Sequence, residues 1–307
     1  MGEKDKTTKT LESYNSVFAD IVNGFLFDGK QIVHEDELIP AEKESQFKTG
    51  GKILSQERDV SKFWMNMNIR IALIGCENQS IPDRLMALRV IGYDGSDYKR
   101  QYNEIISGES KDGKCYPVVT LVIYFGKQDW NYGTDLYSCM DIPQELKPFV
   151  NNYKMNFYSL KDTTPDKIEK FRSDFKIIAE FFYSLNTGAK YHPSDQKFRH
   201  PKEVLDMIDV FADDSRFRDE YNKINEDKEE GISMCELYDR IMMEGEARGM
   251  EKGMEKGMEK GMEKGMEKGV LKTLADLVKK GLITVVQAAE QADMTVSEFR
   301  SKAGLTV

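Results

Sequence analysis

The sequence predicts an α/β core followed by an all-α C-terminal extension. Two apolar segments rich in Val and Ile, at residues 68–79 and 116–126, have the length and composition of strands. Residues 83–106 lie between them and space their apolar side chains like a helix, although Gly92 and Gly95 should weaken it. A strand, a helix, a strand and then further helices are typical of an α/β fold.

The remaining elements of the core are expected on both sides of this unit. Residues 10–27 have the apolar spacing of one amphipathic helix, which should end near Asp28-Gly29. Residues 30–58 are polar and show little periodicity, and residues 154–160 are compatible with a third strand. A helix should begin at Thr164-Pro165 and continue to Phe182, and another should contain Val204, Leu205, Ile208 and Phe211.

The C-terminal third combines an acidic loop, a repeat and a short helical end. The loop is expected at 227–231, and Ser233 with Glu236 forms a capping box for the next helix. GMEK then recurs from Gly249 to Lys268. A four-residue period makes the Met stripe wind around a helix, so the repeat is either a spacer or a Met-rich oligomerisation strip. Residues 270–307 carry two more capping boxes and resemble a helix-turn-helix that docks, dimerises or reads DNA. We expect any homo-oligomer to form through this C-terminal helical region.

Composition narrows the class of protein. The 307 residues include 40% hydrophobic and 32% charged side chains, enough for a folded core. The net charge of −9 argues against a wide basic surface. The excess of acidic residues is concentrated in 202–244, however, so the rest of the chain could still form a local basic groove that binds DNA. The 4 cysteines form no C-x-x-C pair and the 3 histidines are too few for His-rich metal chemistry. We expect a cytoplasmic protein with no membrane segment and no signal peptide.

The candidate site residues are centred on the first predicted strand, residues 68–79. Because side chains alternate along a strand, Ile71, Leu73, Glu77 and Gln79 share one face, while Ala72, Ile74, Cys76 and Asn78 share the other. A carboxylate at the end of an apolar strand is costly to bury without a cation. A turn could bring Asp59 beside Glu77, and these two carboxylates with the carbonyl of Asn78 would make a hard oxygen site for Mg²⁺ or Mn²⁺. The alternative is a structural salt bridge to Arg58 or Arg70.

Two residues on the following helix are candidates for substrate binding. Arg89 and Tyr93 lie four residues apart and therefore share a helix face. They could contact a phosphate, or Arg89 could form an ordinary surface ion pair.

The order of these motifs resembles a known family. An aspartate followed by an apolar strand that ends in Glu-x-Lys or Glu-x-Gln is the signature of PD-(D/E)XK nucleases. Here Glu77-Asn78-Gln79-Ser80 precedes LMALRVIGY and then YPVVTLVIYFGKQDW. This order resembles the recombination-promoting nuclease (Rpn) family of transposase-like proteins, over about residues 7 to 200, and a tail rich in Glu, Lys and Gly is also common there.

The resemblance implies a restriction-endonuclease-like mixed sheet flanked by helices, and metal-dependent hydrolysis of DNA that promotes recombination or transposition. It implies that Asp59 and Glu77 bind the metal and that Gln79 orients the water or contacts the phosphate. Gln79 replaces the commoner lysine, and Arg58 stands where the family has proline. For an accessory acid on the first helix we choose Asp20, with Glu12 also available. A catalytically inactive DNA-binding or self-assembling protein of a mobile element is the alternative.

These expectations divide the chain into four parts. Residues 1–200 would form the nuclease-like domain and 201–248 an acidic helical extension. Residues 249–269 would form the repeat helix or spacer, and 270–307 a small helical region.

Overall fold

The computed structural model describes residues 2–41, 46–49, 52–55, 58–67, 69–110, 113–224 and 231–305. The chain divides into two compact units, Met1–Ile241 and Met242–Val307. Helices 201–224, which the sequence analysis set apart as an extension, pack within the first unit. Among the described residues, no helix is both long and apolar enough to cross a membrane.

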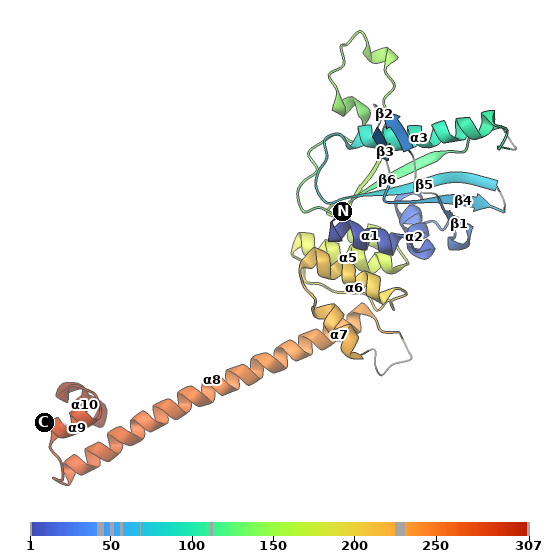
Figure 1. Ribbon diagram of the computed structural model, residues 1–307. Helices are drawn as coiled ribbons and strands as arrows, with labels where there is room; N and C mark the ends of the chain where they lie inside the picture. The colour runs from blue at the N-terminus through green and yellow to red at the C-terminus, as the bar shows by residue number, and fades with distance from the viewer. Residues whose placement is uncertain are drawn as a thin grey trace. The chain divides into compact units, whose positions relative to one another are not determined.

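A five-stranded mixed sheet forms the centre of the first unit (Figure 1). Its order is β1-β4-β5-β6-β7. The strands are β1 (Leu38–Pro40), β4 (Val60–Asn66), β5 (Ile69–Gln79), β6 (Val118–Tyr124) and β7 (Asn156–Ser159). β1, β4 and β5 pair antiparallel, whereas β5, β6 and β7 pair parallel. The mixed α/β class predicted from the sequence is therefore confirmed. β2 (Gln46–Thr49) and β3 (Lys52–Ser55) form a separate antiparallel pair.

Helices cover both faces of this sheet (Figure 1). One face carries α3 (Met86–Ile106), which links β5 to the parallel strand β6. The opposite face carries α1 (Glu3–Glu12), α2 (Asn15–Leu26) and α5 (Asp174–Thr187). The unit also contains α4 (Pro165–Ile168), α6 (Pro201–Ala212), α7 (Arg216–Ile224) and the short 3-10 helices Glu35–Glu37, Leu136–Cys139 and Lys147–Phe149.

The predicted alternation of β5 is confirmed by its packing. Ala72, Ile74 and Cys76 belong to the main core, together with side chains of α2, α5 and α6. Leu73 packs in a different cluster with Phe63 and Val118. Because alternate residues face opposite layers, Glu77 points toward α3 and Asn78 toward α1.

Three local predictions differ from the structure. The single helix expected over 10–27 is two helices, because the backbone of Tyr14 is extended. The buried ammonium of Lys62 donates to the carbonyl of Ser13 at this break, which satisfies the end of α1. The helix expected from Thr164 is likewise split into α4 and α5. Residues 38–40 form a strand within the segment 30–58, which showed little periodicity, and residues 60–66 form a strand that the sequence did not predict.

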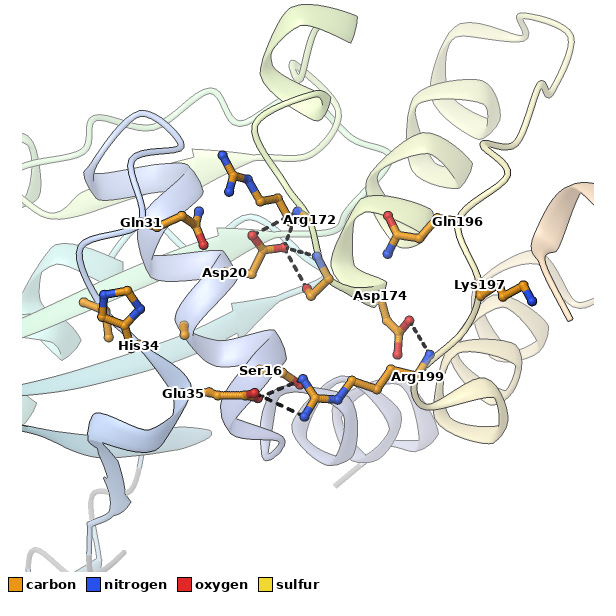
Figure 2. Close-up of a pocket in the computed structure, with 13 residues that line it drawn as sticks. Ser16, Asp20, Gln31, His34, Glu35, Arg172, Asp174, Gln196, Lys197 and Arg199 are labelled. Atoms are coloured by element: carbon orange, nitrogen blue, oxygen red, sulfur yellow. Dashed lines mark hydrogen bonds and ion pairs between the residues drawn. The ribbon is translucent and has the colours of Figure 1, made fainter. Parts of the chain in front are cut away.

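Asp20 joins α2 to the start of α5 (Figure 2). Its carboxylate accepts hydrogen bonds from the backbone N–H groups of Arg172 and Ser173 and from the Ser173 hydroxyl, at 2.7 to 3.0 Å. These groups surround the N-terminal end of α5, where backbone N–H groups lack helical partners. A cavity of about 450 Å³ lies beside them and is lined by Asp20, Arg172 and Arg199, among others.

The second unit contains most of α8 (Met234–Lys279), with α9 (Val285–Gln291) and α10 (Val296–Ala303). α8 begins at Met234, directly after Ser233, which confirms the predicted Ser233–Glu236 capping box, and the GMEK repeat lies within this helix. The five repeat methionines between Met250 and Met266 are 66–77% exposed. The capping boxes at Thr284 and Thr295 are also confirmed. Apart from Gly231, the acidic loop expected at 227–231 lies outside the described residues.

Candidate functional site

The candidate site lies at the carboxyl end of β5, beyond the point where β4 begins. Val60 pairs with Cys76 at the start of the β4–β5 ladder. Asp59 directly precedes β4, and its Oδ2 accepts a 2.6 Å hydrogen bond from the backbone N–H of Asn78. The structure therefore brings Asp59 to β5 beside Glu77.

Glu77 is buried against α3. Its Oε1 accepts hydrogen bonds from Arg89 Nη2 at 2.5 Å, Gln79 Nε2 at 3.2 Å and the Tyr93 hydroxyl at 3.3 Å. Its Oε2 is buried without a hydrogen-bond partner among the described residues. Burial raises the pKa of Glu77 to about 7, the charge of Asp59 adds to this rise, and Arg89 opposes it.

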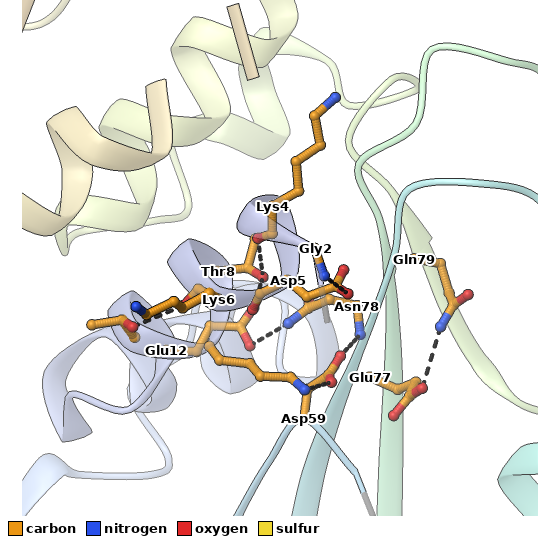
Figure 3. A network of polar contacts seen from close by, with 12 residues as sticks. Gly2, Lys4, Asp5, Lys6, Thr8, Glu12, Asp59, Glu77, Asn78 and Gln79 are labelled. Atoms are coloured by element: carbon orange, nitrogen blue, oxygen red, sulfur yellow. Dashed lines mark hydrogen bonds and ion pairs between the residues drawn. The ribbon is translucent and has the colours of Figure 1, made fainter. Parts of the chain in front are cut away.

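A third acid, Glu12, reaches the site from the end of α1. Its Oε2 accepts a 2.7 Å hydrogen bond from Asn78 Nδ2, whereas its Oε1 is buried without a partner in the described part of the chain. Burial raises the pKa of Glu12 to about 8, and the charges of Asp59 and Glu77 add to this rise. Figure 3 shows Asn78 between Glu12 on one side and Glu77 with Gln79 on the other.

Asp59 is paired with a cation from the same helix. Its Oδ1 lies 2.6 Å from the Nζ of Lys9, which is one turn before Glu12 on α1. The charge of Lys9 also lowers the pKa values of Glu12 and Glu77, so this ammonium acts on all three acids.

The structure places Asp20 away from these acids, which corrects its choice as the accessory acid. Among the described residues, its carboxylate accepts hydrogen bonds only from Arg172 and Ser173 at the start of α5. Glu12, the other acid considered for this role, lies beside Asn78 among the site acids. The signal that distinguishes the two is the end of α1 at Glu12, because the chain turns there and presents Glu12 to β5.

Arg89 and Tyr93 do share a helix face, and both turn toward Glu77. Arg89 donates to Glu77 and also to Asp83 at 3.0 Å, and it pairs with no further acid among the described residues. The Tyr93 hydroxyl contacts both Glu77 and Arg89. In this structure the two residues therefore hold Glu77 in place.

Neither arginine proposed as a structural partner contacts the acids. Arg58 is buried and extends across Gly75 to Asp94 and Asp97 on α3, and its Nε donates to Thr120 Oγ1 at 2.8 Å. Arg70 pairs with Glu104 at the other end of β5. Arg58 thereby anchors the segment that carries Asp59.

The oxygen donors of the site are of the kind that binds a hard divalent cation, although the described side chains are not arranged around a metal position. Among the described residues, no group of three or more His, Cys, Asp and Glu side chains is arranged to hold a metal ion. The donors are nevertheless all oxygen atoms, and Glu12 and Glu77 each keep a buried carboxylate oxygen without a partner. The backbone carbonyl of Gln79 points toward β6, because it accepts a hydrogen bond from the N–H of Phe125. Backbone carbonyls of successive residues point to opposite sides of a strand, so the carbonyl of Asn78 points to the side where Asp59 lies.

Comparison with known proteins supports the family resemblance. Residues 71–186 match the family described as "Putative transposase, YhgA-like". The matched segment includes Glu77, Gln79, Arg89 and Tyr93, whereas Asp59 precedes it. No curated protein and no solved structure matches the chain. Residues 71–186, which contain most of β5, all of α3 and the parallel strands β6 and β7, are therefore similar to the YhgA-like transposase family.

Proposed function

We propose that this protein is a Mg²⁺- or Mn²⁺-dependent DNA endonuclease that promotes recombination or transposition. The observation that carries the proposal is the hydrogen bond from Asn78 N–H to Asp59, which holds two acidic segments together at the end of β5. Beside it, the buried Oε2 of Glu77 has no partner among the described residues. A buried carboxylate oxygen without a donor is costly, and a cation would satisfy it.

Asp59, Glu77 and the carbonyl of Asn78 would hold the metal. When bound, the metal would make water a better nucleophile at neutral pH and offset negative charge on the phosphate. In the hydrolysis, the oxygen of water bonds to phosphorus and one P–O ester bond breaks. The leaving oxygen takes a proton, which leaves a hydroxyl end and a phosphate-monoester end.

The other residues of the site would position these groups. Gln79 uses its amide N–H to hold Glu77, so its amide oxygen is the atom that would accept a hydrogen bond from the attacking water. Arg89 and Tyr93 fix the carboxylate of Glu77. Glu12, through Asn78, fixes the opposite side of the strand end.

A second candidate function is supported by the ion pairs of the site. Asp59 is paired with Lys9 and Glu77 with Arg89. A catalytically inactive DNA-binding or self-assembling protein of a mobile element would also have its acids neutralised by ion pairs within the chain. Such a protein would bind DNA without any need for a divalent cation.

Plasmid cleavage separates the two functions. Supercoiled plasmid should be nicked or linearised in Mg²⁺ or Mn²⁺ and stay intact with EDTA. Glu77→Gln and Asp59→Asn should each lower the rate by roughly 10²-fold or more, because each removes a charge that would hold the metal. Glu104→Gln is the matched control, since Glu104 pairs with Arg70 at the opposite end of β5. Cleavage that persists in EDTA, or that Glu77→Gln leaves unchanged, would contradict the endonuclease proposal.

A further inference from the structure

The strand motif at the site lacks a positive charge. Gln79 occupies the position where a lysine is commoner in such motifs, and its amide donates to Glu77. Three carboxylates, from Glu12, Asp59 and Glu77, act on one another here. A DNA phosphate is also negative, so its approach to this cluster requires a cation.

Lys9 is the cation closest to the acids on the side of α1. Its Nζ lies 2.6 Å from Asp59 Oδ1, and its charge acts on Glu12 and Glu77 as well. Lys9 and Glu12 are three residues apart on α1, so the same helix face presents both. The Lys9 side chain is 24% exposed, which leaves it accessible from solvent.

The donors of Lys9 are less occupied than those of the other cations nearby. Arg89 is bonded to Glu77, Asp83 and Tyr93, and Arg58 is bonded to Asp94, Asp97 and Thr120. In the described part of the chain, Lys9 makes one side-chain contact, to Asp59. An ammonium has three N–H donors, so two remain for a phosphate oxygen.

We propose that Lys9 supplies the positive charge that Gln79 does not provide, by donating to a nonbridging oxygen of the scissile phosphate. This role rests on the proposed nuclease function. Lys9 keeps its protons throughout, and the bonds that form and break are those of the hydrolysis described above. Its charge offsets the negative charge that develops on the phosphate oxygens.

Four full-length variants test this role. Lys9→Gln removes the charge, and Lys9→Arg keeps it. Lys6→Gln is the matched control, because Lys6 is an exposed lysine on the same helix. The double variant Lys9→Gln with Gln79→Lys moves the charge from α1 to the end of β5. Thermal unfolding of each variant establishes that it is folded.

Cleavage in Mn²⁺ should fall by roughly 10²-fold in Lys9→Gln, stay within several-fold of wild type in Lys9→Arg, and stay unchanged in Lys6→Gln. The double variant should cleave at least tenfold faster than Lys9→Gln, because the side chain at position 79 contacts Glu77. Cleavage by Lys9→Gln at the wild-type rate would overturn the role of Lys9 and leave the nuclease function standing.

Two binding measurements distinguish this role from a structural one. Calorimetric titration with Mn²⁺ should show that Lys9→Gln binds the metal at least as tightly as wild type, because a cation that competes for Asp59 is gone. For Lys9→Gln, the binding of a short DNA duplex without metal should depend less on salt. The slope of log K against log salt concentration should decrease in magnitude by about 0.9, the value for one phosphate contact. Parallel loss of Mn²⁺ binding and cleavage in Lys9→Gln would overturn the proposal, because it would indicate that Lys9 maintains the site. A wild-type protein that neither binds Mn²⁺ nor cleaves DNA would overturn the nuclease function and this role with it.

Discussion

The backbone N–H of Asn78 donates a 2.6 Å hydrogen bond to Asp59, which lies in a different segment of the chain. This bond forms where β4 stops pairing with β5, so the Asp59 carboxylate replaces the next strand partner. The side chain of Asn78 meanwhile donates to Glu12 on the other face of the sheet. One residue thus connects two of the three acids at the site.

Asn78→Ala should separate these two contacts. The substitution keeps the backbone bond to Asp59 but removes the donor to Glu12, and that donor lowers the pKa of Glu12. The pKa of Glu12 should therefore rise above its value of about 8, as measured by carbon NMR titration of the carboxyl group. The loss of one hydrogen bond to a buried carboxyl should cost about 1–3 kcal/mol of stability. An unchanged Glu12 titration would contradict this contact.

Metal-free protein should lose stability as the pH rises from about 5 to about 8. The pKa of Glu12 rises from 4.5 to about 8 on folding, so the folded protein keeps a proton that the unfolded chain has lost in this window. Glu77 acts in the same direction up to about pH 7. The free energy of unfolding in EDTA should fall with pH, by at most about 1.4 kcal/mol per unit for each group. Glu12→Gln should flatten this dependence, and parallel curves for the variant and wild type would disprove the assignment.

Arg58 should stabilise the fold far more than Arg70 does. The guanidinium of Arg58 is buried between Asp94 and Asp97, whereas the Arg70 side chain is 43% exposed beside Glu104. Arg58→Met removes the buried guanidinium that both carboxylates share, leaving Asp97 with Arg100 and Asp94 with hydroxyl donors only, and should cost about 3–5 kcal/mol. Arg70→Met should cost about 1 kcal/mol or less. Urea unfolding measures both, and equal losses would refute the anchoring role of Arg58.

Asp20 should matter for stability and not for cleavage. It accepts its hydrogen bonds from Arg172 and Ser173 at the start of α5. Asp20→Asn should lower the free energy of unfolding by about 1.5–3 kcal/mol, the usual worth of a hydrogen bond to a charged group. Below its unfolding temperature, the variant should cleave plasmid at the wild-type rate. A folded Asp20→Asn protein that fails to cleave would restore Asp20 as a site residue.

The sequence predicts those parts of the fold that depend on local patterns. The alternation along β5 correctly assigns Leu73 and Cys76 to opposite faces, because the two side chains pack in separate hydrophobic clusters. The capping box at Ser233 is correct because its contacts span three residues. β4 is missed because its burial depends on β1 and β5, which lie elsewhere in the sequence.

The site is predicted less completely than the fold. Period-two alternation identifies Glu77 and Gln79, but the choice between Glu12 and Asp20 depends on where the first helix ends. That break is stabilised by Lys62, whose ammonium reaches Ser13 from β4. The approach of Lys9 to Asp59 likewise depends on how α1 packs on the sheet. Contacts of this kind leave no local pattern in the sequence.

A crystal structure of the wild-type protein grown with Mn²⁺ tests the central claim most directly. We predict anomalous density for one ion bound by Asp59, Glu77 and the carbonyl of Asn78, with Lys9 released from Asp59. Density for Mn²⁺ at other positions alone, with the 2.6 Å Lys9–Asp59 pair and the Arg89–Glu77 pair intact, would contradict a metal site at the end of β5.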